Sequence, residues 1–223
     1  MSVNLGKEID LLKNYPKSKR DISNRVKSKT KEQQLIARKF GKEFFDGDRE
    51  QGYGGYNYNE KFWVNVVKDF IDFYNLKDGD KILDIGCGKG FMVYDFKKAN
   101  PNLILEGIDI SDYAIENCKP EVKNFLKVGN AKELNYEDNY FDLVISITTV
   151  HNLDLNECKK ALMEIERVSK KNKFITVDAY SDDKEKDLMY AWNLTAQTIL
   201  HTDEWKKLFL EAKYTGDFYW FKP

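Results

Sequence analysis

Hydrophobic residues follow two different spacings along this chain of 223 residues, and the spacing changes near residue 80. Between residues 30 and 74, apolar side chains recur every three or four positions, as at Phe62, Val66 and Phe70. This period predicts amphipathic helices, each with one buried face. The stretch DGDREQGYGGYNYN at 46–59 interrupts the pattern and predicts a loop between helices.

From Asp80 onward, short apolar runs alternate with amphipathic segments. The runs predict strands at 81–86, 103–110, 122–128, 140–147, 173–180 and 215–223. Helices are expected at 90–99, 112–119 and 154–168, with a further helix ending near Leu200 and another starting at Thr202. This alternation is typical of a parallel sheet with helices on both faces, whose ligands bind at the carboxyl ends of the strands. We therefore predict a doubly wound α/β domain with a mostly parallel sheet at 75–223, preceded by a helical N-terminal extension and lid at 1–74.

Three glycines follow the first predicted strand in the sequence KILDIGCGKG, where Gly86, Gly88 and Gly90 occupy alternate positions. Glycine permits tight backbone turns and lets the backbone approach a ligand closely. A dinucleotide-binding loop requires G-x-G-x-x-G, and Phe91 stands where its third glycine belongs. Asp84 precedes the loop, and a carboxylate there suits a positively charged ligand better than a pyrophosphate, which it repels.

Four motifs, ILDIGCGKG, GIDIS, VGNAKEL and FDLVISITTVHNL, make residues 75–180 resemble the class I (Rossmann-like) S-adenosylmethionine-dependent methyltransferases. The resemblance implies that fold and S-adenosyl-L-methionine as the cofactor, which carries an ammonium and a sulfonium and no phosphate. It also implies that Asp109 accepts hydrogen bonds from both ribose hydroxyls and that Asn130, where the family usually has Asp, lies near the adenine. The cofactor-binding residues that it implies are Asp84, Gly86, Cys87, Gly88, Gly90, Asp109, Ile110, Asn130, Ala131 and Ile147.

Methyl transfer requires no nucleophile on the protein, because the cofactor carries the activated group. A general base assists where the acceptor has to lose a proton. His151 directly follows the fourth predicted strand and is our candidate for the catalytic base, with packing as the alternative. The other histidine, His201, lies between two predicted helices and is expected to cap or to pack. Cys87 is expected to pack inside the glycine loop rather than to act as a nucleophile.

Aromatic residues surround a second group of glycines in the sequence GYGGYNYNEKFW at 52–63. Glycines beside large aromatic rings suit a loop that closes over a ligand and excludes water, and aromatic faces attract cations. The alternative is that these rings pack the N-terminal helices onto the sheet. A helix near residue 190 is a second candidate cover, again with core packing as the alternative. The candidate lid and substrate residues are Tyr53, Tyr56, Tyr58, Trp63, Trp192 and Asn193.

The formal net charge of −1 argues against a protein whose main partner is nucleic acid. The charge is uneven, however, since residues 1–49 hold 13 Lys and Arg against 7 Asp and Glu. We expect a solvated helical face there, with a phosphate-binding arm as the alternative. Residues 1–29 are polar and are expected to pack loosely.

Cys87, Cys118 and Cys158 lie far apart, so neither a metal site nor a disulfide framework is readable, and a cytoplasmic location is expected. No stretch approaches the roughly 20 apolar residues of a membrane span. The chain shows one strand after 180, where the family usually has an antiparallel pair. That difference predicts an exposed sheet edge and a candidate surface for a homodimer.

These observations favour a methyltransferase that transfers a methyl group to a small-molecule acceptor by in-line displacement. Methylation of RNA or protein is the alternative within the same enzyme class, and the basic N-terminal region is its support. A cofactor-binding protein without transfer activity is the alternative from another class. The aromatic residues and His151 favour an enzyme over such a binding protein.

Overall fold

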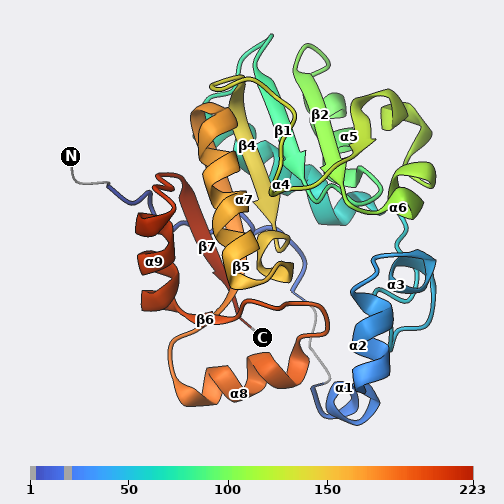
Figure 1. Cartoon of the computed structure of the whole chain (residues 1–223). Coiled ribbons are helices and arrows are strands. Elements are labelled where there is room, and N and C mark those ends of the chain that lie inside the picture. The colour runs from blue at the N-terminus through green and yellow to red at the C-terminus, as the bar shows by residue number, and fades with distance from the viewer. Residues whose placement is uncertain (1–3, 18–21, 223) are drawn as a thin grey trace.

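A computed structural model describes residues 4–17 and 22–222, and these form a seven-stranded sheet flanked by helices (Figure 1). The strands are β1 (Lys81–Ile85), β2 (Ile104–Asp109), β3 (Leu126–Val128), β4 (Phe141–Ile147), β5 (Ser169–Tyr180), β6 (Leu200–His201) and β7 (Asp217–Phe221). The sheet runs in the order β3-β2-β1-β4-β5, and both β6 and β7 pair with β5. Every one of these pairings is parallel, so the predicted doubly wound α/β fold is confirmed.

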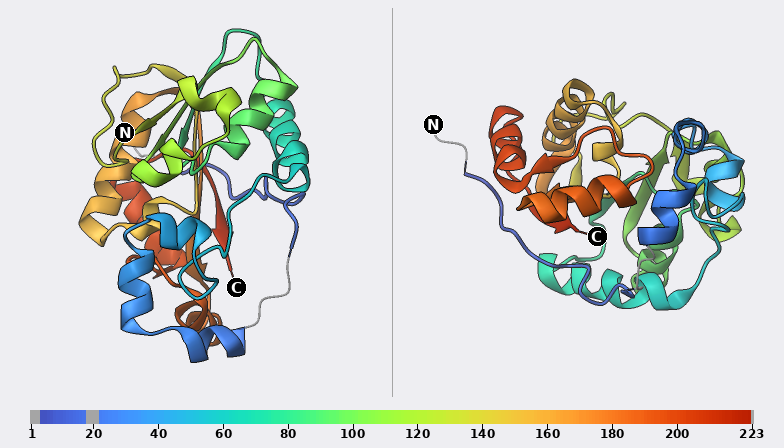
Figure 2. Two further views of the ribbon diagram at one scale, coloured as in Figure 1. Left: turned by 90° about the vertical axis from the view of Figure 1, so that its right-hand side faces the viewer. Right: turned by 90° about the horizontal axis from the view of Figure 1, so that it is seen from below.

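Nine helices in the described part of the chain surround this sheet. They are α1 (Ile22–Ser28), α2 (Lys31–Ala37), α3 (Lys42–Asp46), α4 (Glu60–Tyr74), α5 (Phe91–Ala99), α6 (Asp112–Glu116), α7 (Leu155–Val168), α8 (Asp183–Trp192) and α9 (Thr202–Glu211). The helices α1 to α3 and α8 lie beyond the carboxyl ends of the strands, as Figures 1 and 2 show. The predicted helical N-terminal region is therefore present, and it faces the edge where ligands bind in such sheets.

Successive side chains along the strands point to opposite faces of the sheet, and both faces are buried under helices. In β4, Leu143 and Ile145 pack into a core with α4 and α5, whereas Val144 packs into a second core with α7 and α9. Successive residues of a strand point to opposite faces, so one continuous apolar run serves both cores. The periodic residues Val66, Val67 and Phe70 of α4 are fully buried in the first core, as their spacing predicts.

Two predicted elements differ from the structure, and a short strand, β6, was not predicted, so two strands rather than one follow residue 180. The strand expected at 122–128 covers only Leu126–Val128, because Pro120 begins a 3-10 helix that carries Val122 into the core. The helix expected to end near Leu200 ends at Trp192 instead. Its last residue is followed by Asn193, whose side-chain oxygen accepts the amide N–H of Ala196 at 2.6 Å. Asn side chains that bond nearby amides in this way compete with helical hydrogen bonds.

The segment before residue 18 is packed rather than loose, which corrects the expectation for its described part, residues 4–17. The amide of Ile9 donates to the carbonyl oxygen of Phe218 at 2.9 Å, and the amide of Phe218 donates to that of Lys7 at 2.9 Å. Leu11 is buried in the first core. This segment therefore covers the outer edge of β7, and the prediction of an exposed edge is wrong at Phe218. The proposed homodimer stays a prediction without that support.

Candidate active site

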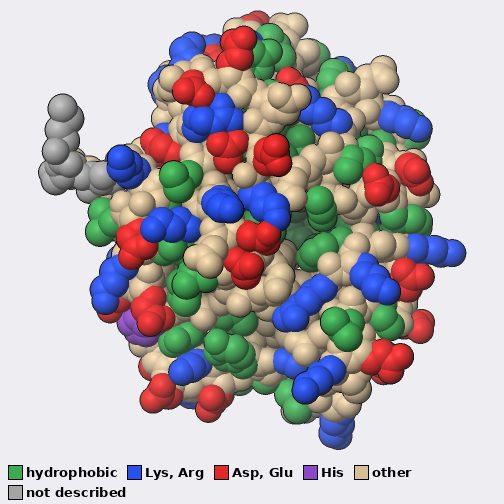
Figure 3. Space-filling view, in the orientation of Figure 1, with side chains coloured by type: hydrophobic (Ala, Val, Ile, Leu, Met, Phe, Trp, Pro, Cys, Tyr) green, Lys and Arg blue, Asp and Glu red, His purple; other side chains and the backbone are tan. Residues whose placement is uncertain are grey.

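A cavity of about 920 Å³ opens at the carboxyl edge of the sheet, under the N-terminal helices. Figure 3 shows a hollow near the middle of the molecule, with hydrophobic side chains inside it and both cationic and acidic side chains at its rim. The sequence-predicted residues that line the cavity are Tyr53, Tyr56, Trp63, Asp84, Gly86, Cys87, Gly88, Asp109, Ile110, Asn130, Ala131, Ile147, His151, Trp192 and Asn193. Gly90 and Tyr58 are not among the lining residues.

Each glycine of the loop after β1 has a positive φ, the region that strongly favours glycine: 81° at Gly86, 54° at Gly88 and 73° at Gly90. A Cβ on Gly86 would lie 2.1 Å from Oγ1 of Thr149, which follows β4. A Cβ on Gly90 would lie 2.4 Å from Leu126, on the protein side of the loop. The outer two glycines therefore allow tight packing within the protein, and Gly90 does not face the cavity.

The buried carboxylate of Asp84 has no hydrogen-bond or ion-pair partner in the described part of the chain, although its side chain is only 6% exposed. Burial, together with the nearby charge of Asp109, raises its pKa to about 7. A buried charge without a partner is unfavourable, so such a group is expected to pair with a ligand. This orphaned acid fits the ammonium group of S-adenosylmethionine, which would favour its ionised form; without a ligand it is half ionised near pH 7 and largely ionised only above that.

Asp109 is held at the end of β2 by two main-chain amides. Its Oδ2 accepts from Gly88 at 2.8 Å, and its Oδ1 accepts from Ser111 at 2.9 Å. Burial raises the pKa of Asp109, while the hydrogen bonds from Ser111, Gly88 and Ile110 oppose that rise. Each oxygen keeps a further lone pair. The carboxylate thus fixes the position of the glycine loop and can still accept hydroxyl groups from the cavity side.

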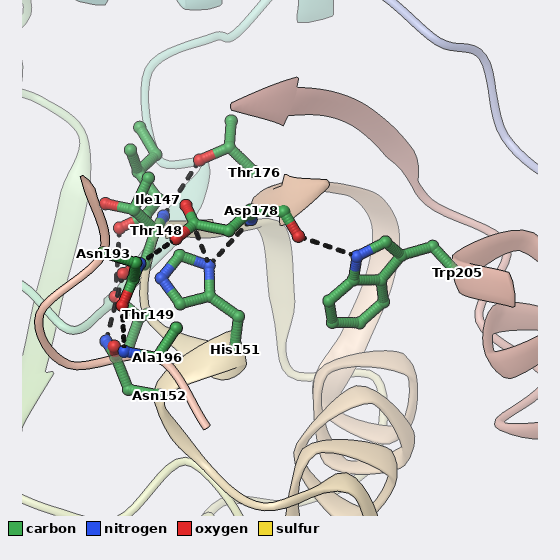
Figure 4. Close-up of polar contacts among 10 residues, drawn as sticks. All are labelled: Ile147, Thr148, Thr149, His151, Asn152, Thr176, Asp178, Asn193, Ala196 and Trp205. Carbon is green, nitrogen blue, oxygen red and sulfur yellow. Dashed lines mark hydrogen bonds and ion pairs between the residues drawn. The ribbon is translucent and has the colours of Figure 1, made fainter. Parts of the chain in front are cut away.

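His151 is 3% exposed and lies in the short 3-10 helix Val150–Asn152 that follows β4, where the main-chain amide of Asp178 donates to its Nδ1 at 3.0 Å (Figure 4). Because Nδ1 accepts this hydrogen bond, we assign the imidazole proton to Nε2. Burial lowers the pKa of His151 and the nearby Asp178 carboxylate opposes this, so the ring is neutral at pH 7. In the described part of the chain no hydrogen-bond partner reaches Nε2.

The turn after β4 also carries backbone strain that the sequence did not reveal. Thr148 has a φ of 49°, which is uncommon for a residue with a β-branched side chain. Its amide donates to both the carbonyl and the hydroxyl oxygen of Thr176 in β5, at 3.1 Å and 2.9 Å. Strained backbone that its neighbours hold in place is often found beside functional sites. Here it directs the chain so that Thr149 and His151 both border the cavity.

Aromatic rings from the predicted lid lie directly on the glycine loop. The ring of Tyr56 stacks on Phe91 with centroids 4.8 Å apart, and a Cβ on Gly88 would lie 3.2 Å from it. Tyr53 packs against Tyr56 with centroids 4.4 Å apart and is 45% exposed. Tyr58 instead donates its hydroxyl to Asp95 at 2.6 Å, on α5. It therefore helps to hold the end of this loop on α5.

An ion pair that sequence reasoning missed joins the N-terminal region to the glycine loop. Asp46, the last residue of α3, accepts from Lys89 Nζ at 2.6 Å and from the hydroxyl of Tyr113 at 2.7 Å. Its other oxygen accepts the amide of Tyr56 at 3.0 Å. The Lys89 side chain is 8% exposed, so this pair is largely shielded from solvent screening. No local sequence signal marks Asp46, because its partners lie 10, 43 and 67 residues away.

Trp192 and Asn193 line the cavity from the end of α8, and Trp63 lines it from α4. The side-chain amide of Asn193 donates to the Asp178 carboxylate, as Figure 4 shows, which connects α8 to the residue that orients His151. Trp63 packs on Tyr15 with centroids 4.9 Å apart, so the N-terminal segment also closes this side. The described residues contain no helix suited to span a membrane and no cluster of side chains suited to hold a metal ion.

The model of the methyltransferase domain family matches residues 76–213, which is more than half of the chain. The chain therefore belongs to the class I, Rossmann-like family of S-adenosylmethionine-dependent methyltransferases. Among curated proteins, it is 32% identical over 145 residues to the tRNA (carboxymethyluridine(34)-5-O)-methyltransferase of Arabidopsis thaliana. That match covers 64% of this chain and 33% of the relative. It is also 34% identical over 97 residues to phosphoethanolamine N-methyltransferase 3 of Arabidopsis thaliana, which covers 39% of this chain and 19% of the relative.

The chain thus matches between a third and just under half of the length of the first curated relatives. Among solved structures, the YcgJ protein of Bacillus subtilis aligns with a TM-score of 0.54 and 18% identity, over 66% of each chain. A putative methyltransferase of Bacillus halodurans C-125 aligns with a TM-score of 0.52 and 17% identity, over 66% of this chain and 67% of the other. At these identities the two structures show a shared fold.

Proposed function

We propose that this protein transfers a methyl group from S-adenosylmethionine to a small-molecule acceptor inside the covered cavity. One observation carries the proposal: a single cavity of about 920 Å³ contains the orphaned Asp84 carboxylate at the glycine loop and also His151. Family membership supports methyl transfer, and the cover formed by residues 22–59 supports a small acceptor. A volume of this size is at the upper end of the range for small-molecule sites.

The chain's own residues supply binding, orientation and exclusion of water. Asp84 would hold the ammonium group of the cofactor and Asp109 its ribose hydroxyls, while Tyr53 and Tyr56 cover the loop. When bound, S-adenosylmethionine supplies an activated methyl group that a nucleophilic atom of the acceptor displaces in line. The protein then needs to align the two reactants, and alignment is worth on the order of 7–11 kcal/mol.

His151 in this arrangement acts as a hydrogen-bond donor rather than as a base. With the proton on Nε2 and Nδ1 occupied by the Asp178 amide, the ring offers no free lone pair to the cavity. We therefore propose that Nε2–H orients the acceptor by donating to one of its oxygen or nitrogen atoms. This role replaces the base that the sequence suggested, and it keeps His151 as the candidate catalytic residue.

A second candidate acceptor is tRNA, because the first of the relatives described above is a tRNA methyltransferase. The excess of cationic residues in 1–49 also suits a phosphate backbone. The buried position of the cavity beneath α1 to α3 favours the small molecule, since a nucleotide within an RNA strand would have to displace this cover.

Labelled cofactor tests the proposal. We would incubate the protein with methyl-labelled S-adenosylmethionine and, separately, with a metabolite extract, total tRNA and a protein extract. Label in small molecules supports the proposal, and label confined to tRNA establishes the second candidate. Label in none of the three, from a protein that binds S-adenosylhomocysteine in calorimetry, would leave a binding protein without transfer activity and would refute both.

A further inference from the structure

Residues 22–59 bring only positive charge to the cavity wall. Within residues 22–59, the charged side chains that line the cavity are Arg25, Arg38, Lys39 and Arg49, and none of the lining residues there is acidic. The glycine-loop end of the same cavity carries Asp84 and Asp109. These two parts of the cavity wall therefore carry opposite charge, with carboxylates beside the glycine loop and cations on the cover.

No carboxylate in the described part of the chain forms a direct ion pair with these arginines, although Glu50 lies near Arg25. Their hydrogen bonds go to main-chain oxygens. Arg25 is 8% exposed. Its Nη1 donates to the carbonyl oxygen of Glu50 at 3.2 Å, and its guanidinium lies 5.4 Å from the centre of the Trp192 ring. Arg49 donates to the carbonyl oxygen of Gly52. A guanidinium has five N–H donors, so most donors on both side chains remain available.

A third arginine of the cover, Arg38, connects it to the loop beside His151. Arg38 donates to the carbonyl oxygens of Thr195 and Ala196, each at 3.1 Å. The next two residues, Gln197 and Thr198, donate their amides to the carbonyl oxygen of His151, each at 3.0 Å. One short loop thus connects the cationic cover to the histidine that is expected to face the acceptor.

The remaining carboxylates at the cavity are engaged elsewhere. Asp178 accepts from the side chain of Asn193, and Asp10 accepts from the amide of Leu12 at 3.0 Å. Burial and the neighbouring charge of Arg49 lower the pKa of Arg25, and the nearby carboxylate of Glu50 only partly opposes them. An anionic ligand would relieve this repulsion and would use the unfilled donors.

We propose that Arg25 and Arg49 bind an oxyanion of the methyl acceptor, a carboxylate or a phosphate group. The proposal rests on the proposed function, since it names the acceptor class of that same site. Guanidinium groups match both oxyanions through paired N–H donors, and such charge-assisted bonds are among the strong hydrogen bonds of proteins. Arg38 supports the site by holding the loop at 195–198 in place. The carboxylate of the cofactor is the other source of the same chemistry, and the test separates the two.

The test measures binding without turnover. Protein saturated with S-adenosylhomocysteine is titrated with inorganic phosphate and with succinate, in wild type, Arg49→Gln and Arg25→Gln. At least one anion is expected to bind, with an affinity at least tenfold lower in each variant. Lys207→Gln, which removes an exposed cation from α9, serves as the matched control and is expected to bind as wild type does. Arg49 is exposed, so its variant keeps the test decisive even where Arg25→Gln fails to fold.

Three results would overturn the proposal: no binding of either anion to wild type, equal losses in Arg49→Gln and Lys207→Gln, or a tenfold loss of S-adenosylhomocysteine affinity in Arg49→Gln. The last result would assign the arginines to the cofactor's carboxylate. A protein that binds an anion through Arg49 yet transfers no methyl group would refute the proposed function and leave the anion site standing. A protein that methylates only uncharged acceptors would refute the anion site and leave the proposed function standing.

Discussion

Replacing Asp84 by Asn is expected to stabilise the ligand-free protein while weakening cofactor binding. The reason is the buried, unpartnered carboxylate, whose pKa burial raises from the ordinary 3.8 to about 7. A group that binds its proton more tightly in the folded state stabilises that state when protonated. As the pH rises past the ordinary value, the unfolded chain ionises first, and the folded chain carries a growing penalty that is complete above about pH 7.

The size of this penalty follows from the two pKa values. At about 1.4 kcal/mol per pKa unit, the difference between them amounts to about 4 kcal/mol above pH 7 and to about 2 kcal/mol at pH 5. Asn is similar in size to Asp and carries no charge, so Asp84→Asn removes the penalty. We expect the free energy of unfolding to rise by up to about 4 kcal/mol at pH 8 and by about half of that at pH 5.

Urea unfolding of the ligand-free protein at both pH values measures this gain, and calorimetry with S-adenosylhomocysteine at pH 8 measures the affinity. We expect the affinity to fall at least about tenfold, since the ammonium group loses a charged partner. Asp187→Asn, an exposed position on α8, is the control and should change the free energy of unfolding by less than about 0.5 kcal/mol. An Asp84→Asn protein that is less stable than wild type at pH 8, or equally stabilised at both pH values, would refute the reasoning.

Three further substitutions test the other parts of the site. Asp109→Ala should weaken S-adenosylhomocysteine binding at least about tenfold. It should also lower the free energy of unfolding by about 2 kcal/mol, because the amide of Gly88 loses its acceptor. An unchanged affinity in calorimetry would contradict the assignment of Asp109 to the ribose hydroxyls. His151→Asn should lower kcat by about ten- to a hundredfold with cofactor affinity kept within about twofold, whereas equal losses of activity and melting temperature would indicate packing. Asp46→Asn should leave the buried Lys89 without a counter-charge and cost about 1–3 kcal/mol of stability. It should also speed proteolysis of residues 47–59 in the ligand-free protein, with protection restored by S-adenosylhomocysteine. A cleavage rate equal to that of wild type would rule out this lid contact.

Local signals in the sequence were sufficient for the strands of the sheet other than β6, and for the loop that follows its first strand. Apolar runs such as 140–147 mark buried strands, because a parallel sheet buries both faces and needs apolar residues at successive positions. The glycines after β1 mark a turn that residues with a Cβ rarely adopt, and Gly86 and Gly88 do take positive φ values. His201 was expected to cap or to pack, and its ring accepts the amide of Asp203 at 3.1 Å at the start of α9.

Residue spacing does not reveal which distant side chains meet, and the tertiary structure alone decided the cover of the cavity. Asp46 reaches Lys89 across 43 residues, and Arg38 reaches Thr195 across 157. The hydrogen bond that places the proton of His151 comes from the amide of Asp178, on a different strand. The composition of residues 1–49 showed an excess of cations, but only the folded chain places Arg25 and Arg49 at the cavity, because helix packing determines which of many surface charges turn inward.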